Sequence, residues 1–92
     1  MPQIEEQELV ETKELLEDIY VIIVWNDNIN TFDHVIECLS KYCEHTIEQA
    51  EQCTYIIHFK GKCDVKKGDK EKLTEIYNQL SNAGLTATLE QS

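Results

Sequence analysis

Six consecutive apolar residues, Tyr20–Trp25, constrain the fold of this chain more than any other feature. β-branched and aromatic side chains dominate the run, and this composition is typical of a buried strand. The run ends at residues 26–31, where asparagine and aspartate favour a tight turn. The sequence therefore predicts a buried strand that carries polar side chains to the rim of an apolar core.

Three helices are predicted after this turn, because apolar residues recur every three or four positions. The first starts at a cap residue, Asn30 or Thr31, and the second at a capping box that begins with Thr46. The third is capped by Asp69 and stops at Gly84. The residues expected on their inner faces are Phe32, Val35, Ile36, Leu39, Tyr42, Cys43, Ile47, Ala50, Thr54, Ile57, Leu73, Ile76, Tyr77 and Leu80.

Two further strands complete the predicted domain. A short one contains Cys63 and Val65 and leads into a turn over residues 66–69, and the last strand alternates through Leu85, Ala87 and Leu89. A chain of 92 residues has room for one small domain. We therefore expect an α+β domain over residues 19–92, with the order β-α-α-β-α-β and a three-stranded, mostly antiparallel sheet packed on three helices.

The net charge of −10 is concentrated at the N-terminus. Residues 1–18 contain seven acidic residues and one basic residue, which predicts a flexible acidic extension. Such a charge disfavours nucleic acid and anionic membranes as partners, because their phosphates would be repelled. With no apolar run long enough to span a membrane and no apolar signal core, we expect a cytoplasmic protein with reduced cysteines. The oligomeric state is open from these features, and our default is a monomer that docks on a larger partner.

Catalytic and metal signatures are weak in this chain. It carries no GxSxG, HExxH or GxGxxG motif, so we expect a protein that is not an enzyme. A small zinc-binding module is a competing hypothesis, but the candidate ligands form no CxxC pair, and buried cysteine behaves as a small apolar residue. We therefore predict no metal and no cofactor. The candidate zinc ligands are His34, Cys38, Cys43, His45, Cys53, His58 and Cys63.

Two more hypotheses remain open from the residues alone. A small enzyme would pair His58 with Asp27 or Cys53, although no motif for stabilising an oxyanion or holding a cofactor accompanies them. A plain interaction module would use only its acidic segment, residues 1–18.

The end of the first strand carries the most informative chemistry. Asn26 offers an amide oxygen, Asp27 a carboxylate, and His58 a ring nitrogen near the end of the second helix. Apolar side chains expected beside them form a small hollow. Acceptors next to such a hollow suit an ammonium group that bears an apolar side chain, such as a free peptide N-terminus with a large hydrophobic first residue. The residues expected to line the hollow are Phe32, Val35, Thr54 and Ile57.

Several segments, in order, resemble the signature of the ClpS family, the adaptors of the bacterial ATP-dependent Clp protease. The resemblance runs from about Tyr20 to the C-terminus and so covers nearly all of the predicted domain. The Asn-Asp pair, the His-x-x-Gly-Lys spacing and the final strand occur together. The segments are Val24–Asn28, Thr31–Ile36, Glu48–Ala50, Ile57–His58 with Gly61–Lys62, and Gly84–Glu90.

The resemblance implies an adaptor for substrates whose first residue is Leu, Phe, Tyr or Trp, as in the N-end rule. ClpS-like adaptors deliver such substrates to a ClpA- or ClpC-type AAA+ unfoldase that feeds the ClpP peptidase, and their N-terminal extension engages the unfoldase. The residues that contact the α-amino group of the N-degron are implied to be Asn26, Asp27 and His58. The side-chain pocket is implied to comprise Phe32, Val35, Thr54, Ile57 and Leu85, with Asn28, Asn30 and Thr31 at its rim.

Three positions depart from many relatives. Asn28 stands where a second acidic residue is frequent, so ammonium binding relies more on Asp27. Phe32 replaces a methionine that acts as a gate against β-branched side chains, and Thr54 replaces a larger apolar residue. A stiffer Phe32 and a smaller Thr54 retune the shape of the expected pocket.

Overall fold

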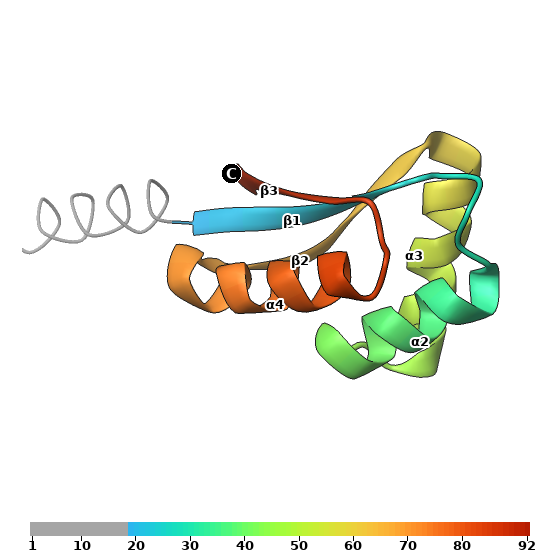
Figure 1. The fold of residues 1–92 in the computed structure, drawn as a ribbon, viewed down its shortest axis with the longest axis horizontal. Coiled ribbons are helices and arrows are strands. Elements are labelled where there is room, and N and C mark those ends of the chain that lie inside the picture. The colour runs from blue at the N-terminus through green and yellow to red at the C-terminus, as the bar shows by residue number, and fades with distance from the viewer. Residues whose placement is uncertain (1–18) are drawn as a thin grey trace, which may run out of the picture.

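The structure, a computed structural model, describes residues 19–92. The predicted acidic extension over residues 1–18 lies outside the described residues. The elements follow the predicted order β-α-α-β-α-β (Figure 1). They are β1 (Ile19–Trp25), α2 (Phe32–Tyr42), α3 (Ile47–Lys60), β2 (Lys62–Asp69), α4 (Lys70–Asn82) and β3 (Ala87–Gln91).

β1 is the central strand of the sheet, because β2 and β3 both pair with it in antiparallel orientation. Its middle residues, Val21–Val24, are all buried, as the unbroken apolar run predicts. Trp25 at its end pairs with Lys62, and the next backbone N–H, that of Asn26, donates to the carbonyl of Gly61 at 2.8 Å. β1 therefore delivers the polar turn to the place where α3 ends.

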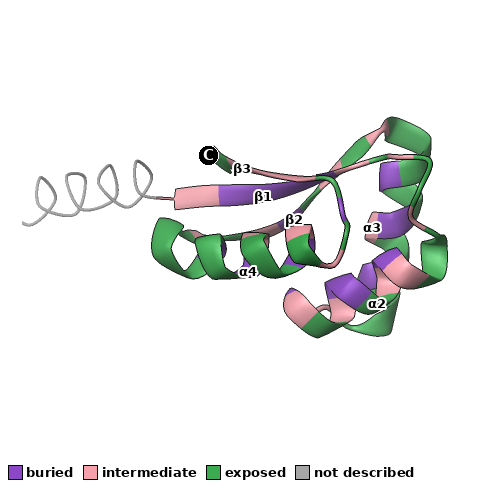
Figure 2. Cartoon of the chain, in the orientation of Figure 1, coloured by how far each residue is buried: buried purple, intermediate pink, exposed green. Residues whose placement is uncertain are grey.

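The helices α2, α3 and α4, which lie within residues 19–92, all contribute to one core. α4 lies along one face of the sheet, and α2 and α3 pack together beyond the end of the sheet (Figure 1). Ile22 and Val24 of β1 share this core with Leu39 of α2, Ala50 of α3 and Leu73 of α4. Figure 2 shows these buried stretches on β1, α2 and α3. None of the helices among residues 19–92 is long and apolar enough to cross a membrane.

The predicted helix caps are confirmed. Thr31 accepts from the backbone N–H of His34, and Asp69 accepts from that of Lys72 at 2.8 Å. Thr46 and Gln49 form a complete capping box, with bonds of 3.2 and 3.0 Å. These bonds satisfy N–H groups that have no partner within the helix, so each helix begins where the local sequence predicts.

Three local predictions were wrong, and tertiary contacts explain each. Residues 66–69 form no turn, because they pair with Ile19–Ile22 and extend β2 to Asp69. Leu85 is buried but precedes β3, because its N–H donates to Leu80 at the end of α4. Ile47 is 56% exposed, because it lies in an open groove between α2 and α3 instead of in the core.

Candidate functional site

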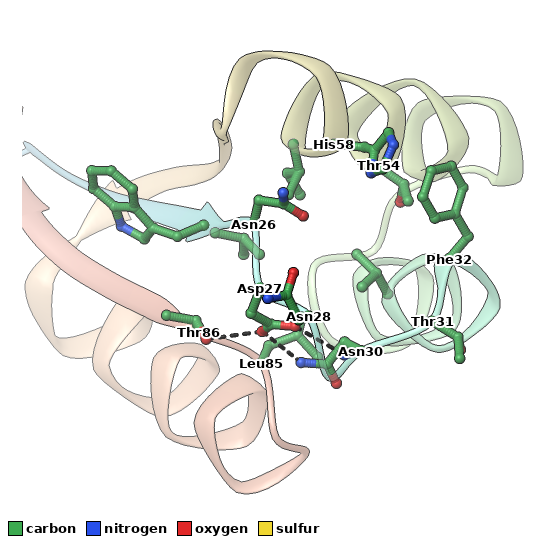
Figure 3. A pocket seen from close by; sticks show the side chains of 14 residues that line it. Asn26, Asp27, Asn28, Asn30, Thr31, Phe32, Thr54, His58, Leu85 and Thr86 are labelled. Atoms are coloured by element: carbon green, nitrogen blue, oxygen red, sulfur yellow. Dashed lines mark hydrogen bonds between the residues drawn. The ribbon is translucent and has the colours of Figure 1, made fainter.

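The predicted site residues come together around one pocket with a volume of about 180 Å³ (Figure 3). The pocket lies where the end of β1, the first turn of α2, the second half of α3 and the loop before β3 converge. Sequence reasoning missed three of its lining residues, Val24, Trp25 and Thr86. The complete lining is Val24, Trp25, Asn26, Asp27, Asn28, Asn30, Thr31, Phe32, Val35, Thr54, Ile57, His58, Leu85 and Thr86.

Asp27 organises the turn at one side of the pocket. Its Oδ1 accepts from the backbone N–H groups of Ile29 and Asn30, at 3.0 and 2.9 Å. Its Oδ2 accepts from the Asn30 side-chain amide at 2.8 Å and from the Thr86 hydroxyl at 2.9 Å. Asparagine and aspartate commonly build turns in this way, by bonding to the backbone shortly after them. The carboxylate therefore holds the turn closed and joins it to the segment that leads into β3.

The same network fixes the charge at this side of the site. Burial raises the pKa of Asp27, but the hydrogen bonds from Asn30, Ile29 and Thr86 outweigh that effect and hold the pKa below its ordinary value of 3.8. Asn30 also donates to the carbonyl of Gly84 at 2.8 Å. The turn thus holds an ionised carboxylate and is hydrogen-bonded to Gly84 and Thr86 of the loop between α4 and β3.

The walls of the pocket are apolar. Val35, Ile57 and Leu85 are buried and line it from three different segments. Thr54 is also buried, and its hydroxyl donates to the carbonyl of Ala50 within the same helix at 2.7 Å. Because that hydroxyl hydrogen is already bonded, Thr54 offers the pocket no free donor. The interior is suited to an apolar side chain.

Phe32 stands at the mouth of the pocket and is 37% exposed. Its ring meets His58 edge-on, with centroids 5.0 Å apart, and Tyr55 in the same manner at 5.6 Å. Edge-to-face contacts of this kind are a favoured geometry for aromatic rings. Phe32 is thus held by two neighbours on α3. Tyr55 was not among the predicted site residues, because its outward position on α3 gives no sign of contact with α2.

Two polar groups at the mouth are unused. Among residues 19–92, neither the side-chain amide of Asn26 nor the ring nitrogens of His58 make a hydrogen bond to another residue. Figure 3 shows both side chains on the α3 side of the pocket, away from the hydrogen-bonded turn. They are therefore available to a ligand, whereas the oxygens of Asp27 already accept four bonds.

His34 and His45 both lie against backbone carbonyls, and the four cysteines are free thiols. His34 Nε2 lies 2.8 Å from the Ala83 carbonyl and 3.6 Å from Cys38 Sγ, and His45 Nε2 lies 2.6 Å from the Val65 carbonyl. Burial raises the pKa of Cys43 to about 11, so this thiol is protonated at neutral pH. Within the described part of the chain, no three His, Cys, Asp or Glu side chains are grouped as metal ligands.

The pair of Asp27 and His58, considered from the sequence as an acid–base couple, is not formed. Both carboxylate oxygens of Asp27 accept from the turn and from Thr86, and none of these four bonds involves His58. Among residues 19–92, His58 has no hydrogen bond to a carboxylate of the kind that orients a catalytic histidine.

Comparison with known proteins identifies the family of this chain. A family profile described as "ATP-dependent Clp protease adaptor protein ClpS" matches residues 16–88. The ClpS adapter of Thermosynechococcus vestitus is 37% identical over 87 residues, which cover 94% of this chain and 93% of that protein. The ClpS adapter of a Nostoc species is 43% identical over 68 residues, which cover 73% of this chain and 70% of that protein.

A solved structure shows the same fold. ClpS2 of Agrobacterium tumefaciens, bound to L-phenylalaninamide, superposes with a TM-score of 0.70 at 18% sequence identity, covering 83% of this chain and 99% of that one. The predicted α+β architecture is thereby confirmed. The chain belongs to the ClpS family of adaptor proteins of the ATP-dependent Clp protease.

Proposed function

We propose that this adaptor recognises proteins by a free N-terminal amino group and a large hydrophobic first side chain, namely Leu, Phe, Tyr or Trp. It then delivers them to a ClpA- or ClpC-type AAA+ unfoldase of the Clp protease. One observation carries the proposal: an apolar pocket of about 180 Å³ has the unused acceptors of Asn26 and His58 and the ionised Asp27 around its mouth.

The α-amino group is the polar anchor of the ligand. Asn26 and His58 each offer it an acceptor, while Asp27 supplies a negative charge. A carboxylate has about four lone-pair positions, and the four bonds within the fold occupy those of Asp27. Asp27 thus acts on the ammonium through its charge and through the shape of the turn. Blocking the amine removes the positive charge and its hydrogen-bond donors and leaves the acceptors of the site unpaired, so most of the affinity is lost.

The first side chain of the ligand provides the apolar part of the affinity. Burying a Leu or Phe side chain contributes about 1.5–3 kcal/mol. The cavity is smaller than the roughly 300–1,000 Å³ of sites for drug-sized molecules, which suits one side chain. The ligand of the Agrobacterium ClpS2 structure, L-phenylalaninamide, has this chemistry: a free amine beside an aromatic side chain. Phe32 narrows the mouth and disfavours β-branched residues.

Delivery needs a second contact, which we assign to residues 1–18. With seven acidic residues and one lysine, this segment suits a basic surface on the unfoldase. In this proposal the adaptor acts as a monomer in the cytoplasm. Deleting residues 1–18 should leave peptide binding intact and stop degradation of a substrate by the unfoldase and protease.

Fluorescence anisotropy with labelled peptides that differ only in the first residue tests the recognition. Free N-terminal Leu and Phe should bind, N-terminal Arg and acetylated Leu should not, and N-terminal Ile should bind weakly. Binding of acetylated Leu as tightly as free Leu would overturn the proposal, because the amine would then play no part. Absence of binding to all five peptides would also overturn it.

A further inference from the structure

Aromatic rings continue from the pocket onto the outer surface of α3. Phe59 is 76% exposed and Tyr55 is 53% exposed. Four residues apart on one helix, they lie on the same face, and their rings stack with centroids 6.2 Å apart and planes 10° apart. Phe59 also meets His58 at 5.1 Å, and Tyr55 meets Phe32 at 5.6 Å. The outer rings are therefore continuous with two residues that line the pocket.

The core gives no reason for these outer rings. α3 packs inward through Ala50, Thr54 and Ile57, and Tyr55 and Phe59 belong to the opposite, exposed side of the helix. Among residues 19–92, no segment covers them. Exposed aromatic residues that cluster beside a pocket mark an interaction surface. What remains to be identified is the occupant.

The geometry points to the substrate itself as that occupant. We propose that Tyr55 and Phe59 form a second subsite, which binds an aromatic or large apolar side chain at the second or third residue of the substrate. This inference rests on the proposed function, since the first residue must be anchored in the pocket. It adds to that function a preference determined beyond the first residue.

The distance from the pocket to the outer rings supports this assignment. The His58 ring, which we place at the α-amino group, lies 5.1 Å from the Phe59 ring. An extended chain advances about 3.3–3.6 Å per residue, so the second and third residues leave the mouth at the distance of these rings. Side chains alternate along an extended chain. If the ligand is straight, the side chain of its third residue points toward α3, and if the ligand bends over α3, the side chain of its second residue does.

Five peptides test the subsite. All begin with a free Phe and continue with glycines and serines, and they carry Trp at the second position, at the third, at both, at neither, or only far down the chain. We expect the peptide with Trp at both positions, and one of the two peptides with a single Trp near the start, to bind the wild-type protein roughly three- to tenfold more tightly than the peptide without Trp, which is the range of one aromatic pair. The peptide with a distant Trp should show no gain.

Variants of α3 locate the contact. Phe59→Gln, in the full-length chain, removes the outermost ring and no lining residue of the pocket, so it should abolish most of the gain from Trp. The matched control is Ile47→Gln, which replaces another exposed apolar residue of the same helix outside the ring cluster, and it should retain the gain. Thermal melting of both variants checks that the fold is intact.

The outcomes separate the two proposals. If the Phe-first peptides bind but Trp gives no gain, or if the gain persists in Phe59→Gln, the subsite is overturned and the proposed function stands. A gain from the distant Trp would overturn the subsite as non-specific adhesion. Normal peptide binding by Phe59→Gln with its gain intact, but with delivery lost, would assign the rings to the unfoldase instead. If no Phe-first peptide binds, both proposals fail together.

Discussion

The two sides of the pocket differ in how their polar and aromatic groups are used. On the turn side, Asp27 accepts four hydrogen bonds and Asn30 bridges it to Gly84, so the polar side chains of this network are bonded within the fold. On the α3 side, the ring nitrogens of His58 have no hydrogen-bond partner among residues 19–92, and Phe59 is largely exposed.

This difference suggests a division of labour within one site. Groups that are saturated inside the fold hold a shape and a charge in place, and they have little capacity left for a ligand. Groups that are unpaired and exposed lose little when a ligand covers them, and they gain a hydrogen bond or an aromatic contact. The turn should therefore prepare the pocket, and α3 together with Asn26 should meet the ligand.

Asp27→Ala should have the largest effect on binding. It removes both the charge and the acceptor of four hydrogen bonds, so the affinity for a Phe-first peptide should fall at least about a hundredfold. The fold should persist, because this network lies at the rim of the domain and outside its core. Anisotropy measures the affinity, and circular dichroism measures the fold.

Asp27→Asn separates the two contributions of this residue. Asparagine retains an oxygen that can accept from Ile29 and Asn30, but it carries no charge. We expect intermediate affinity. Affinity equal to wild type in Asp27→Ala would refute the role of this side of the site altogether.

Asn26→Ala should weaken binding about tenfold or more and leave stability unchanged. A hydrogen bond to a charged group contributes about 1.5–3 kcal/mol, and the Asn26 side chain makes no hydrogen bond to any of residues 19–92 that the change would remove. Titration gives the affinity and thermal melting gives the stability. If Asn26→Ala melted at a lower temperature but bound the peptide normally, Asn26 would be a structural residue and not a ligand-binding one.

Asn30→Ala should mainly affect stability. Its amide bonds both to Asp27 and to Gly84, so we expect the free energy of unfolding to fall by about 1 kcal/mol, with a smaller loss of affinity through the loosened turn. Asn28→Ala is the matched control in the same turn, because the Asn28 side chain makes no hydrogen bond within the described residues. Equal melting temperatures of the two variants would contradict a stabilising role for the hydrogen bonds from Asn30 to Asp27 and Gly84.

The smallest expected effect is the pH dependence of stability that Asp27 contributes. Because the fold lowers the pKa of Asp27, its carboxylate stabilises the folded state at pH values above its ordinary pKa of 3.8. That contribution is lost as the pH falls through the lower, folded pKa. Melting curves from neutral to strongly acidic pH should show wild type losing its advantage over Asp27→Asn only at the acidic end. A constant advantage would contradict this linkage.

Local signals were sufficient for most of the fold. The apolar run before Asn26 predicts β1, and the caps at Thr31, Thr46 and Asp69 mark the starts of the helices, because each cap bonds to a backbone group three residues away. The same local signals place Asn26 and Asp27 at the end of a buried strand. The candidate site could therefore be found from its first polar residues.

Pairings between distant parts of the chain decided the rest. β2 continues through Lys66–Asp69 because β1 lies beside it. The Asp27 carboxylate accepts its fourth hydrogen bond from Thr86, which lies 59 residues further along the chain. Phe32 contacts Tyr55 because α2 and α3 pack together. Near neighbours along the chain settle which residues form the strand, the caps and the polar turn, so these features can be predicted from local patterns. Which polar groups are bonded within the fold and which stay available to a ligand depends on contacts between segments far apart in the chain, and local patterns carry no information about those contacts.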